Sequence, residues 1–258
     1  MLTIHYYLDP SGKHDKLYQI ACDFARELAK KEARFDEVLL LCREDKKISD
    51  IQKELEQEPL ERFNNGIRFS GTGPLFIIRS LREYLRDVFS TALLIACGLD
   101  TGDLFKLGDK CRASVIIAVP DEVHDIEQWI KTWDPREISG AEPVVKSYPL
   151  PSCVIKVGLD EMMERGYAKE KYMENEYVRF TIQSLTKHHP EIDGNEVKAY
   201  LMRKGSWPET EARKVKDYID LLKVEKRFSR SDDPEMILSY QRWRQACINR
   251  QFPSFPFS

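Results

Sequence analysis

Two short apolar runs separated by a polar turn constrain the fold of this chain more than any other feature. The runs cover residues 92–97 and 113–119, and the turn begins with residues 98–103, Gly-Leu-Asp-Thr-Gly-Asp. A run that is apolar on both faces is typical of a central strand in a parallel sheet covered by helices. The turn would then follow the carboxyl end of a buried strand, where open α/β sheets bind their ligands. We therefore predict an α/β fold with a site at this edge of the sheet.

The alternation of apolar strand and amphipathic helix also occurs on both sides of this stretch. Between residues 17 and 28, for example, Ala21, Phe24 and Leu28 share one helical face. Such alternation predicts a parallel, Rossmann-like sheet flanked by helices, with right-handed crossovers. The predicted strands are residues 2–8, 38–42, 66–70, 92–97 and 113–119, with candidate edge strands at 144–148 and 153–157, and the main predicted helices are residues 15–28, 49–59, 75–89 and 121–133.

Beyond residue 157 the alternation ends and helical patterns predominate. We therefore predict two domains, a Rossmann-like α/β domain over residues 1–157 and a helical domain over residues 158–258. Three of the later helical patterns are followed by a candidate short strand at residues 224–228, Val-Glu-Lys-Arg-Phe. That order matches a winged-helix module if the segment is a strand.

The charge pattern of residues 198–230 distinguishes a nucleic-acid module from a structural one. This segment holds ten Lys and Arg residues and five Asp and Glu residues. A nucleic-acid module would gather the cations on one face. If acids and cations alternate instead, pairs at i, i+4 spacing such as Glu209 and Arg213 neutralise each other locally. We favour the alternating arrangement, so binding of nucleic acid through this segment is not the preferred interpretation.

Small polar residues follow several of the predicted strands. Free N–H groups at helix N-termini suit an anion there, although the same residue types are ordinary turn and capping residues. The convergence of several such turns on one sheet edge favours a ligand site. Asp121 and Glu122 follow the fifth strand at the same edge. The candidate ligand-binding residues are Asp9, Ser11, Lys13, Ser70, Thr72, Asp100, Thr101 and Asp103.

No phosphate-binding motif is met at these turns. Residues 70–74, Ser-Gly-Thr-Gly-Pro, are not a G-x-G-x-x-G element, and residues 9–14 lack the leading glycine of a P-loop. Asp9, Glu44, Asp100 and Asp103 are carboxylates of the kind that Mg²⁺ prefers. We favour turn and cap roles for these acids and predict neither a metal site nor a cofactor.

The composition narrows the class of protein. With 42% hydrophobic residues the chain can bury a core, and a net charge of −3 does not indicate a generally basic nucleic-acid binder. It has no apolar run that could span a bilayer, and residues 1–8 lack the features of a signal peptide. We therefore predict a cytoplasmic protein without membrane association and with reduced thiols. The six cysteines are Cys22, Cys42, Cys97, Cys111, Cys153 and Cys247.

In architecture the chain resembles the CRISPR-associated Rossmann-fold ligand sensors, which join a Rossmann-like domain to a winged-helix module. In those proteins the turn after the fourth strand carries an acid or amide, a hydroxyl residue and a later basic residue. Asp100, Thr101 and Lys106 correspond to these residue types, although their spacing differs. The resemblance implies a sensor of a small ligand.

Three functional hypotheses follow from the sequence. The first is a regulatory or sensor protein that binds a nucleotide-like or other anionic ligand at the carboxyl edge of its sheet and contacts a partner through its helical domain. The second is a Mg²⁺-dependent phosphoesterase or nuclease that uses the acids at the strand ends. The third is a structural interaction module that binds no ligand.

Overall fold

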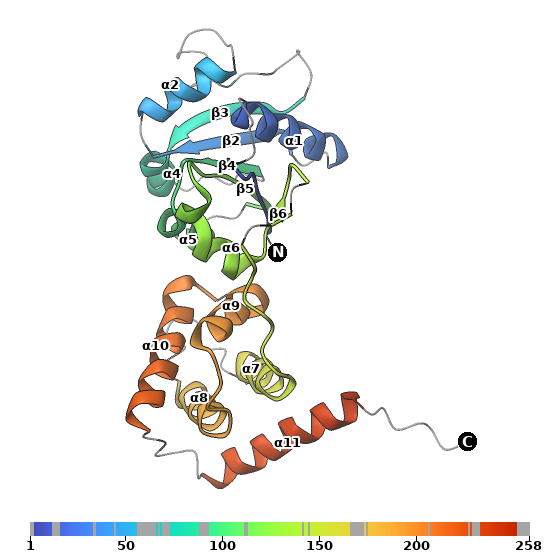
Figure 1. The fold of residues 1–258 in the computed structure, drawn as a ribbon, viewed down its shortest axis with the longest axis vertical. Coiled ribbons are helices and arrows are strands. Elements are labelled where there is room, and N and C mark those ends of the chain that lie inside the picture. Colours follow the sequence, from blue (N-terminus) through green and yellow to red (C-terminus); the bar gives the residue numbers. More distant parts are fainter. Residues whose placement is uncertain are drawn as a thin grey trace, which may run out of the picture. The chain divides into compact units, whose positions relative to one another are not determined.

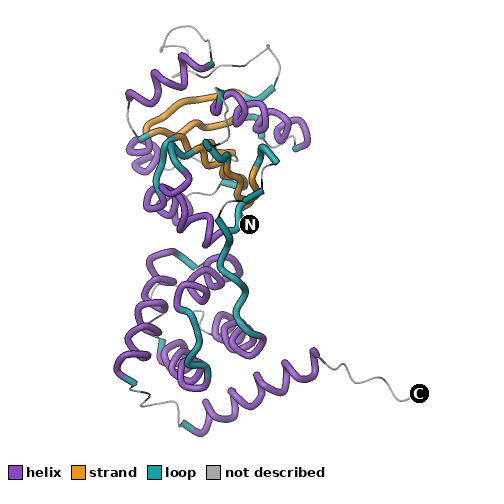
Figure 2. The backbone as a smooth tube through the Cα atoms, in the orientation of Figure 1, coloured by secondary structure: helices purple, strands orange, loops and turns teal. Residues whose placement is uncertain are grey.

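Two compact units make up the chain, Met1–Ser147 and Tyr148–Ser258. A sheet with flanking helices forms the first unit, and helices form the second (Figure 1, Figure 2). A domain boundary at residue 157 would fall inside a helix, because residues 153–165 are helical. The computed structural model describes residues 3–11, 16–32, 35–43, 45–55, 66, 68, 73–87, 93–110, 113–140, 142–143, 145–165, 173, 175–205, 207–226, 228 and 233–251.

The first unit contains a six-stranded sheet in the order β3-β2-β4-β5-β1-β6, and every pairing is parallel. The predicted α/β fold with a parallel sheet flanked by helices is thus confirmed. The order differs from the common Rossmann order 3-2-1-4-5-6, because β1 lies between β5 and β6. The strands are β1 (Ile4–Tyr7), β2 (Glu37–Cys42), β3 (Leu75–Ser80), β4 (Leu93–Cys97), β5 (Val115–Val119) and β6 (Arg136–Glu137).

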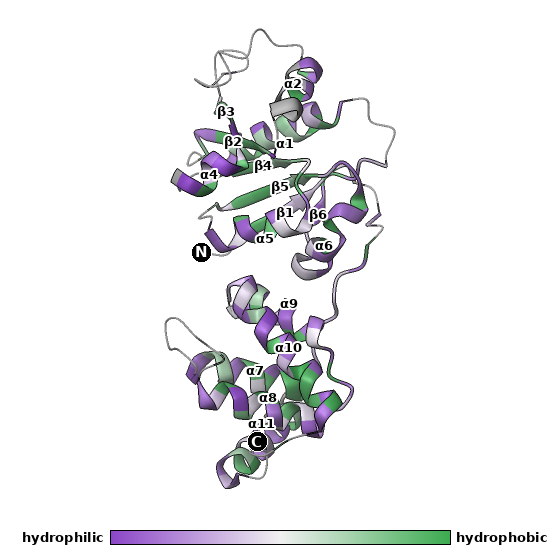
Figure 3. Ribbon diagram, turned by 90° about the vertical axis from the view of Figure 1, so that its left-hand side faces the viewer, coloured by the Kyte–Doolittle hydropathy of each residue, from purple (hydrophilic) through white to green (hydrophobic). Residues whose placement is uncertain are grey.

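Helices cover both faces of this sheet. The chain moves in one direction across the sheet from β1 to β3 and in the other direction from β3 to β6. Right-handed crossovers therefore place the first helices on one face and the later helices on the other, as Figures 1 and 3 show. The first face carries α1 (Leu17–Lys31) and α2 (Asp45–Glu54), and the second carries α4 (Leu81–Asp87), α5 (Thr101–Lys110), the 3-10 turn η2 (Val123–Ile126) and α6 (Glu127–Trp133).

Strands β4 and β5 are buried along their whole length, as their apolar sequences predict. Alternate residues such as Ile95 and Ile117 join the core under α1 and α2. The free thiols of Cys22, Cys42 and Cys97 are buried. These three cysteines are therefore part of the apolar core, as their sequence contexts predict.

Several predicted elements differ from the structure. Residues 75–80 form strand β3, whereas the sequence pattern predicted a helix over residues 75–89, of which α4 is only a short part. A stretch such as Leu-Phe-Ile-Ile fits either element, and pairing with β2 stabilises the strand. Of the strand predicted at residues 66–70, the structure describes Gly66 and Arg68, and neither is in a strand.

The predicted edge strands also differ. Residues 145–148 have no regular structure, and residues 153–157 are the first part of a helix. The edge of the sheet next to β1 is instead formed by β6, which pairs with Tyr6 and Tyr7. A strand of two residues has too short a pattern to be recognised in the sequence.

The second unit is built from helices around its own core. Gly158 allows close approach there, since a Cβ atom at this position would lie 3.1 Å from both Leu185 and Trp243. Glu161 joins its own helix to two others, because its carboxylate accepts hydrogen bonds from Trp243 Nε1 (2.9 Å) and Tyr177 Oη (2.8 Å) and contacts Arg242. The helices are α7 (Cys153–Arg165), α8 (Glu176–His188), α9 (Gly194–Gly205), α10 (Glu209–Glu225) and α11 (Pro234–Gln251).

The strand predicted at residues 224–228 is not present in the described residues. Val224 and Glu225 end α10, and Lys226 caps that helix in the left-handed conformation with a φ of 53°. Phe228 has no regular structure. The winged-helix layout therefore lacks its predicted wing strand in this part of the chain.

A disulfide between Cys153 and Cys247 joins the start of α7 to α11. The prediction that these two thiols are reduced is therefore wrong. The partners are 94 residues apart in sequence, and only the packing of α7 against α11 brings their Cα atoms to 5.9 Å, within disulfide range. Disulfides are rare in the reducing cytosol, so the cytoplasmic location stays a prediction. Cys111 lies outside the described residues.

None of the helices in the described part of the chain combines the length and the apolar character that crossing a bilayer requires.

Candidate ligand site

Ligands of parallel α/β sheets bind at the carboxyl ends of neighbouring strands whose chains leave toward opposite faces. Two boundaries of this kind carry residues that the sequence singled out. One lies between β2, which leads to α2, and β4, which leads to α5 on the other face. The second lies between β1, which leads to α1, and β5, which leads to η2 and α6.

At the β2/β4 boundary, Arg43 bridges Asp100 and Asp103. The Arg43 guanidinium donates from Nε to Asp103 Oδ2 at 2.8 Å and from Nη2 to Asp100 Oδ2 at 2.5 Å, with a second contact from Nη2 to Asp103. Lys106 Nζ lies 3.2 Å from the other Asp103 oxygen. Only 9% of the Asp103 side chain is exposed. An ion-pair cluster of the protein's own side chains therefore occupies this boundary, with Arg43 and Asp100 about half exposed.

Asp100 also caps helix α5. Its Oδ1 atom accepts a hydrogen bond from the backbone N–H of Asp103 at 3.0 Å. Partial burial acts to raise the pKa of Asp100, but the hydrogen bonds from Arg43 and from the backbone N–H groups of Asp103 and Gly102 outweigh it and lower the pKa. The same carboxylates raise the pKa of Arg43. Asp100 and Arg43 thus serve capping and ion pairing, in line with the turn and cap roles favoured for the acids from the sequence.

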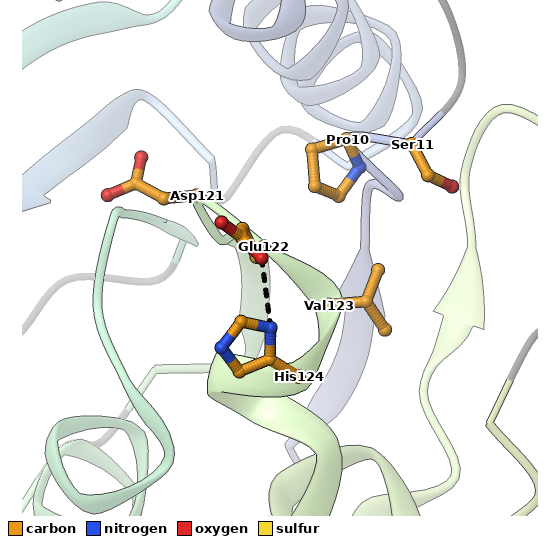
Figure 4. A pocket seen from close by; sticks show the side chains of 6 residues that line it. All are labelled: Pro10, Ser11, Asp121, Glu122, Val123 and His124. Atoms are coloured by element: carbon orange, nitrogen blue, oxygen red, sulfur yellow. Dashed lines mark ion pairs between the residues drawn. The ribbon is translucent and has the colours of Figure 1, made fainter.

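At the β1/β5 boundary the structure has a pocket of about 340 Å³ (Figure 4). Two of its residues follow β1 and the others follow β5 and begin η2. The lining residues are Pro10, Ser11, Asp121, Glu122, Val123 and His124.

On the β1 wall, a buried carboxylate fixes Ser11. Asp9 is only 4% exposed, and its Oδ1 atom accepts hydrogen bonds from Ser11 N at 2.8 Å and from Ser11 Oγ at 2.6 Å. Such an Asx turn is a standard way to order the chain after a strand. The hydroxyl proton of Ser11 is thus directed to Asp9, and its oxygen remains an acceptor.

On the β5 wall, Glu122 and Asp125 cap η2 reciprocally. The Glu122 side chain accepts from the backbone N–H of Asp125, and Asp125 Oδ2 accepts from Glu122 N at 3.2 Å. His124 Nδ1 lies 3.0 Å from Glu122 Oε2, the contact drawn in Figure 4, and His124 Nε2 lies 3.4 Å from Asp125 Oδ1. The Glu122 and His124 side chains are about two-thirds exposed, so this charged group is accessible to solvent.

The structure separates the predicted site residues. Asp9 and Ser11 lie at the β1/β5 boundary, whereas Asp100 and Asp103 belong to the β2/β4 boundary, with Thr101 half-buried at the first residue of α5. Lys13, Ser70 and Thr72 lie outside the described residues. Gly73 lies just before β3 and therefore at the amino end of that strand. The sequence predicted this residue at the carboxyl end of a strand.

His124 is not among the site residues predicted from the sequence. The sequence does contain one indication of an ordered turn at His124. Glu122 and Asp125 flank it with the spacing of a capping box, directly after a predicted strand. In the described residues, no group of three or more His, Cys, Asp or Glu side chains is arranged to hold a metal ion. The Mg²⁺ hypothesis gains no support from these acids, because Arg43 binds Asp100 and Asp103 while Asp9 lies at the other boundary; Glu44 is outside the described residues.

In the basic segment, residues 198–230, acids pair with the cations. Lys198 Nζ lies 2.7 Å from Glu209 Oε1, Lys216 Nζ lies 2.7 Å from Asp220 Oδ2, and Lys214 pairs with Glu211. The predicted i, i+4 pair of Glu209 and Arg213 is present at 3.9 Å. The alternating arrangement is thus confirmed for the described residues, and it does not favour a nucleic-acid face.

Comparison of the chain with models of known protein families, with curated proteins and with solved structures found no match. The fold and the two strand boundaries are therefore the basis for assigning a function.

Proposed function

We propose that the chain is a regulatory sensor whose α/β unit binds a nucleotide-like ligand in the β1/β5 pocket and whose helical unit contacts a partner. The observation that carries the proposal is the pocket itself, which lies where neighbouring strands lead to opposite faces of the sheet. Its volume of about 340 Å³ is within the usual range for small-molecule sites.

The β2/β4 boundary and the helical unit also support placing the ligand in the β1/β5 pocket. The β2/β4 boundary is filled by Arg43 and its two aspartates, so a ligand there would have to displace an ion-pair cluster. A purely structural module would have both boundaries filled in this way, whereas the β1/β5 boundary is hollow. The second unit has a separate core that includes Trp243 and Leu185, as expected of a domain of its own.

Thermal-shift and calorimetric titration with mononucleotides, dinucleotides and cyclic nucleotides tests the proposal. A ligand at a hundred times its Kd stabilises the native state by about 2.7 kcal/mol. Val123→Trp, which puts bulk into the pocket wall, should abolish the shift. Val224→Trp is the matched control, since Val224 is 82% exposed in the helical unit. If no nucleotide stabilises the wild-type chain at millimolar concentration, the proposal is wrong.

A further inference from the structure

The two sulfur atoms of the disulfide lie in different surroundings. Cys153 is half-buried, whereas Cys247 is only 4% exposed. The free thiols of Cys22, Cys42 and Cys97 are fully buried in the α/β unit. Thiol–disulfide exchange begins when a thiolate reaches a sulfur atom. Of the cysteines that the structure describes, Cys153 therefore offers a reductant the best access.

The position of Cys153 in α7 favours its reduced form. The backbone C=O of Ser152 accepts a hydrogen bond from the N–H of Lys156 at 2.8 Å, so Cys153 is the first residue inside this helix of 13 residues. The N–H groups of a first helical turn have no partner within the helix and carry partial positive charge. They stabilise a thiolate. A disulfide whose reduced form is stabilised in this way is reduced more readily.

The disulfide also anchors the C-terminal end of α11. Cys247 is the buried residue of the segment 244–249, and the others are half-buried or exposed, with Ile248 47% exposed. The middle of α11 has a different anchor, because Trp243 is buried and donates to Glu161 at 2.9 Å. Opening of the disulfide would therefore loosen the end of the helix while Trp243 keeps its middle in place.

We propose that the Cys153–Cys247 disulfide is a reversible redox switch that a dithiol opens in the folded protein, releasing the end of α11, residues 244–249, from α7. The inference goes beyond the proposed function and is independent of it, since both cysteines belong to the helical unit. The chemical class of reductant is a molecule or protein with two neighbouring thiols.

The exchange is balanced in two steps. A thiolate of the dithiol attacks Sγ of Cys153 and forms a mixed disulfide, while Cys247 leaves as a thiolate and takes up a proton. The second thiol of the reductant then loses its proton and attacks its own partner sulfur in the mixed disulfide. Cys153 leaves and is protonated or held as a thiolate by the start of α7. The protein disulfide gains two electrons, and the dithiol is oxidised to a cyclic or vicinal disulfide.

The first measurement is the rate of reduction by dithiothreitol in native buffer, followed by iodoacetamide labelling and mass spectrometry. The full chain carries Cys111→Ser, because Cys111 lies outside the described residues. Doubling the dithiothreitol concentration should double the rate, and urea well below the unfolding midpoint should change it by less than about twofold. Cys22, Cys42 and Cys97 should stay unlabelled, which shows that the protein remains folded. Adding glutathione disulfide after the reductant is removed should restore the link.

The second measurement is hydrogen exchange of the oxidised and reduced chain. Amides of residues 244–249 should exchange at least about tenfold faster after reduction, because the end of α11 opens locally. Residues 212–222 of α10 should change by less than about threefold and serve as the internal control. The double variant Cys153→Ser with Cys247→Ser, in the same Cys111→Ser background, should match the reduced chain with or without dithiothreitol.

Three outcomes would overturn the switch. The first is reduction that occurs only together with labelling of the core thiols, or that rises steeply with urea, since the disulfide would then open only on unfolding. The second is unchanged exchange at residues 244–249 after reduction, and the third is failure of glutathione disulfide to re-form the link. None of these results bears on nucleotide binding by the α/β unit, and a failure of nucleotide binding would leave the switch intact.

Discussion

At the residue scale, His5 on β1 is buried against two tryptophans. Its ring centroid lies 5.4 Å from that of Trp129 and 4.4 Å from that of Trp133, and the residue is 8% exposed. Burial lowers the pKa of His5 from 6.5 to about 4. The unfolded chain therefore binds a proton more readily than the folded chain between these two pH values.

This shift predicts acid destabilisation of the α/β unit. The contribution of neutral His5 is complete above pH 6.5 and is lost as the pH falls toward 4, so the free energy of unfolding should be about 2 kcal/mol lower at pH 5 than at pH 7. Urea titrations at the two pH values measure it. His5→Phe keeps a buried ring and should remove most of this difference; an undiminished difference in the variant would assign it to other groups.

Arg43 is the second residue with a specific energetic role. Arg43→Met removes the guanidinium but keeps much of the aliphatic stem. The nearly buried Asp103 carboxylate then loses the Arg43 ion pair and keeps the one with Lys106. Because Arg43 is itself half-exposed, we expect a loss of about 1–2 kcal/mol, less than for a fully buried pair. Lys30→Met, which breaks the exposed pair with Glu27, should change the free energy of unfolding by under about 0.5 kcal/mol. Urea titration measures both variants. An equal loss of stability in Arg43→Met and Lys30→Met would contradict a stabilising role of Arg43.

At the element scale, a disulfide links α11 covalently to α7. It closes a loop of 94 residues between Cys153 on α7 and Cys247 on α11. Glu161 adds polar contacts to Trp243 and Arg242 of the same helix. Tyr240 stacks on His188 of α8 with ring centroids 4.0 Å apart. The helix thus has a covalent link in addition to its side-chain contacts.

Replacing both cysteines, Cys153→Ser with Cys247→Ser, should lower the free energy of unfolding of the helical unit by about 2–5 kcal/mol, because the unfolded chain regains the entropy of an open loop. Chemical denaturation followed by circular dichroism measures it. Reduction of the wild type should have the same effect, and reductant should not change the double variant. Wild-type protein that is insensitive to reductant would show that the link contributes nothing to stability.

Apolar spacing predicted the type of an element correctly where one face of a helix is buried. It did not distinguish helix from strand in a short, continuously apolar segment. In helix α1, Ala21 is buried and Phe24 and Leu28 pack against the core, as the periodicity predicts. Residues 75–80 fit a helix or a strand equally, and the six-residue pairing of β3 with β2 decides the matter. A strand is stabilised both by its own side-chain pattern and by pairing with a neighbouring strand. Only the side-chain pattern is visible in the sequence of the segment itself.

At the scale of the whole molecule, the chain has two compact units with separate cores. We predict two transitions in scanning calorimetry, since units with separate cores need not unfold together. Reductant should move only the transition of the helical unit, by roughly 10 °C or more. A bound nucleoside or nucleotide should move only the α/β transition, by roughly 5–10 °C. A single transition that shifts with both treatments would contradict this independence.

The amino-acid sequence by itself determined the α/β class, the buried central strands β4 and β5 and the helical character of residues beyond 158. Each follows from apolar spacing within a few residues, which is a local property. Asp9 and Ser11 were likewise placed beside a sheet edge because turn residues follow a strand.

Only the tertiary structure decided which strand ends meet. The order β3-β2-β4-β5-β1-β6 places β1 next to β5, so Ser11 faces a pocket with Glu122 and not the turn at Asp100. It also brings Arg43 to Asp100, and helix packing brings Cys153 to Cys247. These partners lie far apart in sequence, and their meeting depends on the path of the chain through the sheet and between the helices, which no local pattern of side chains encodes.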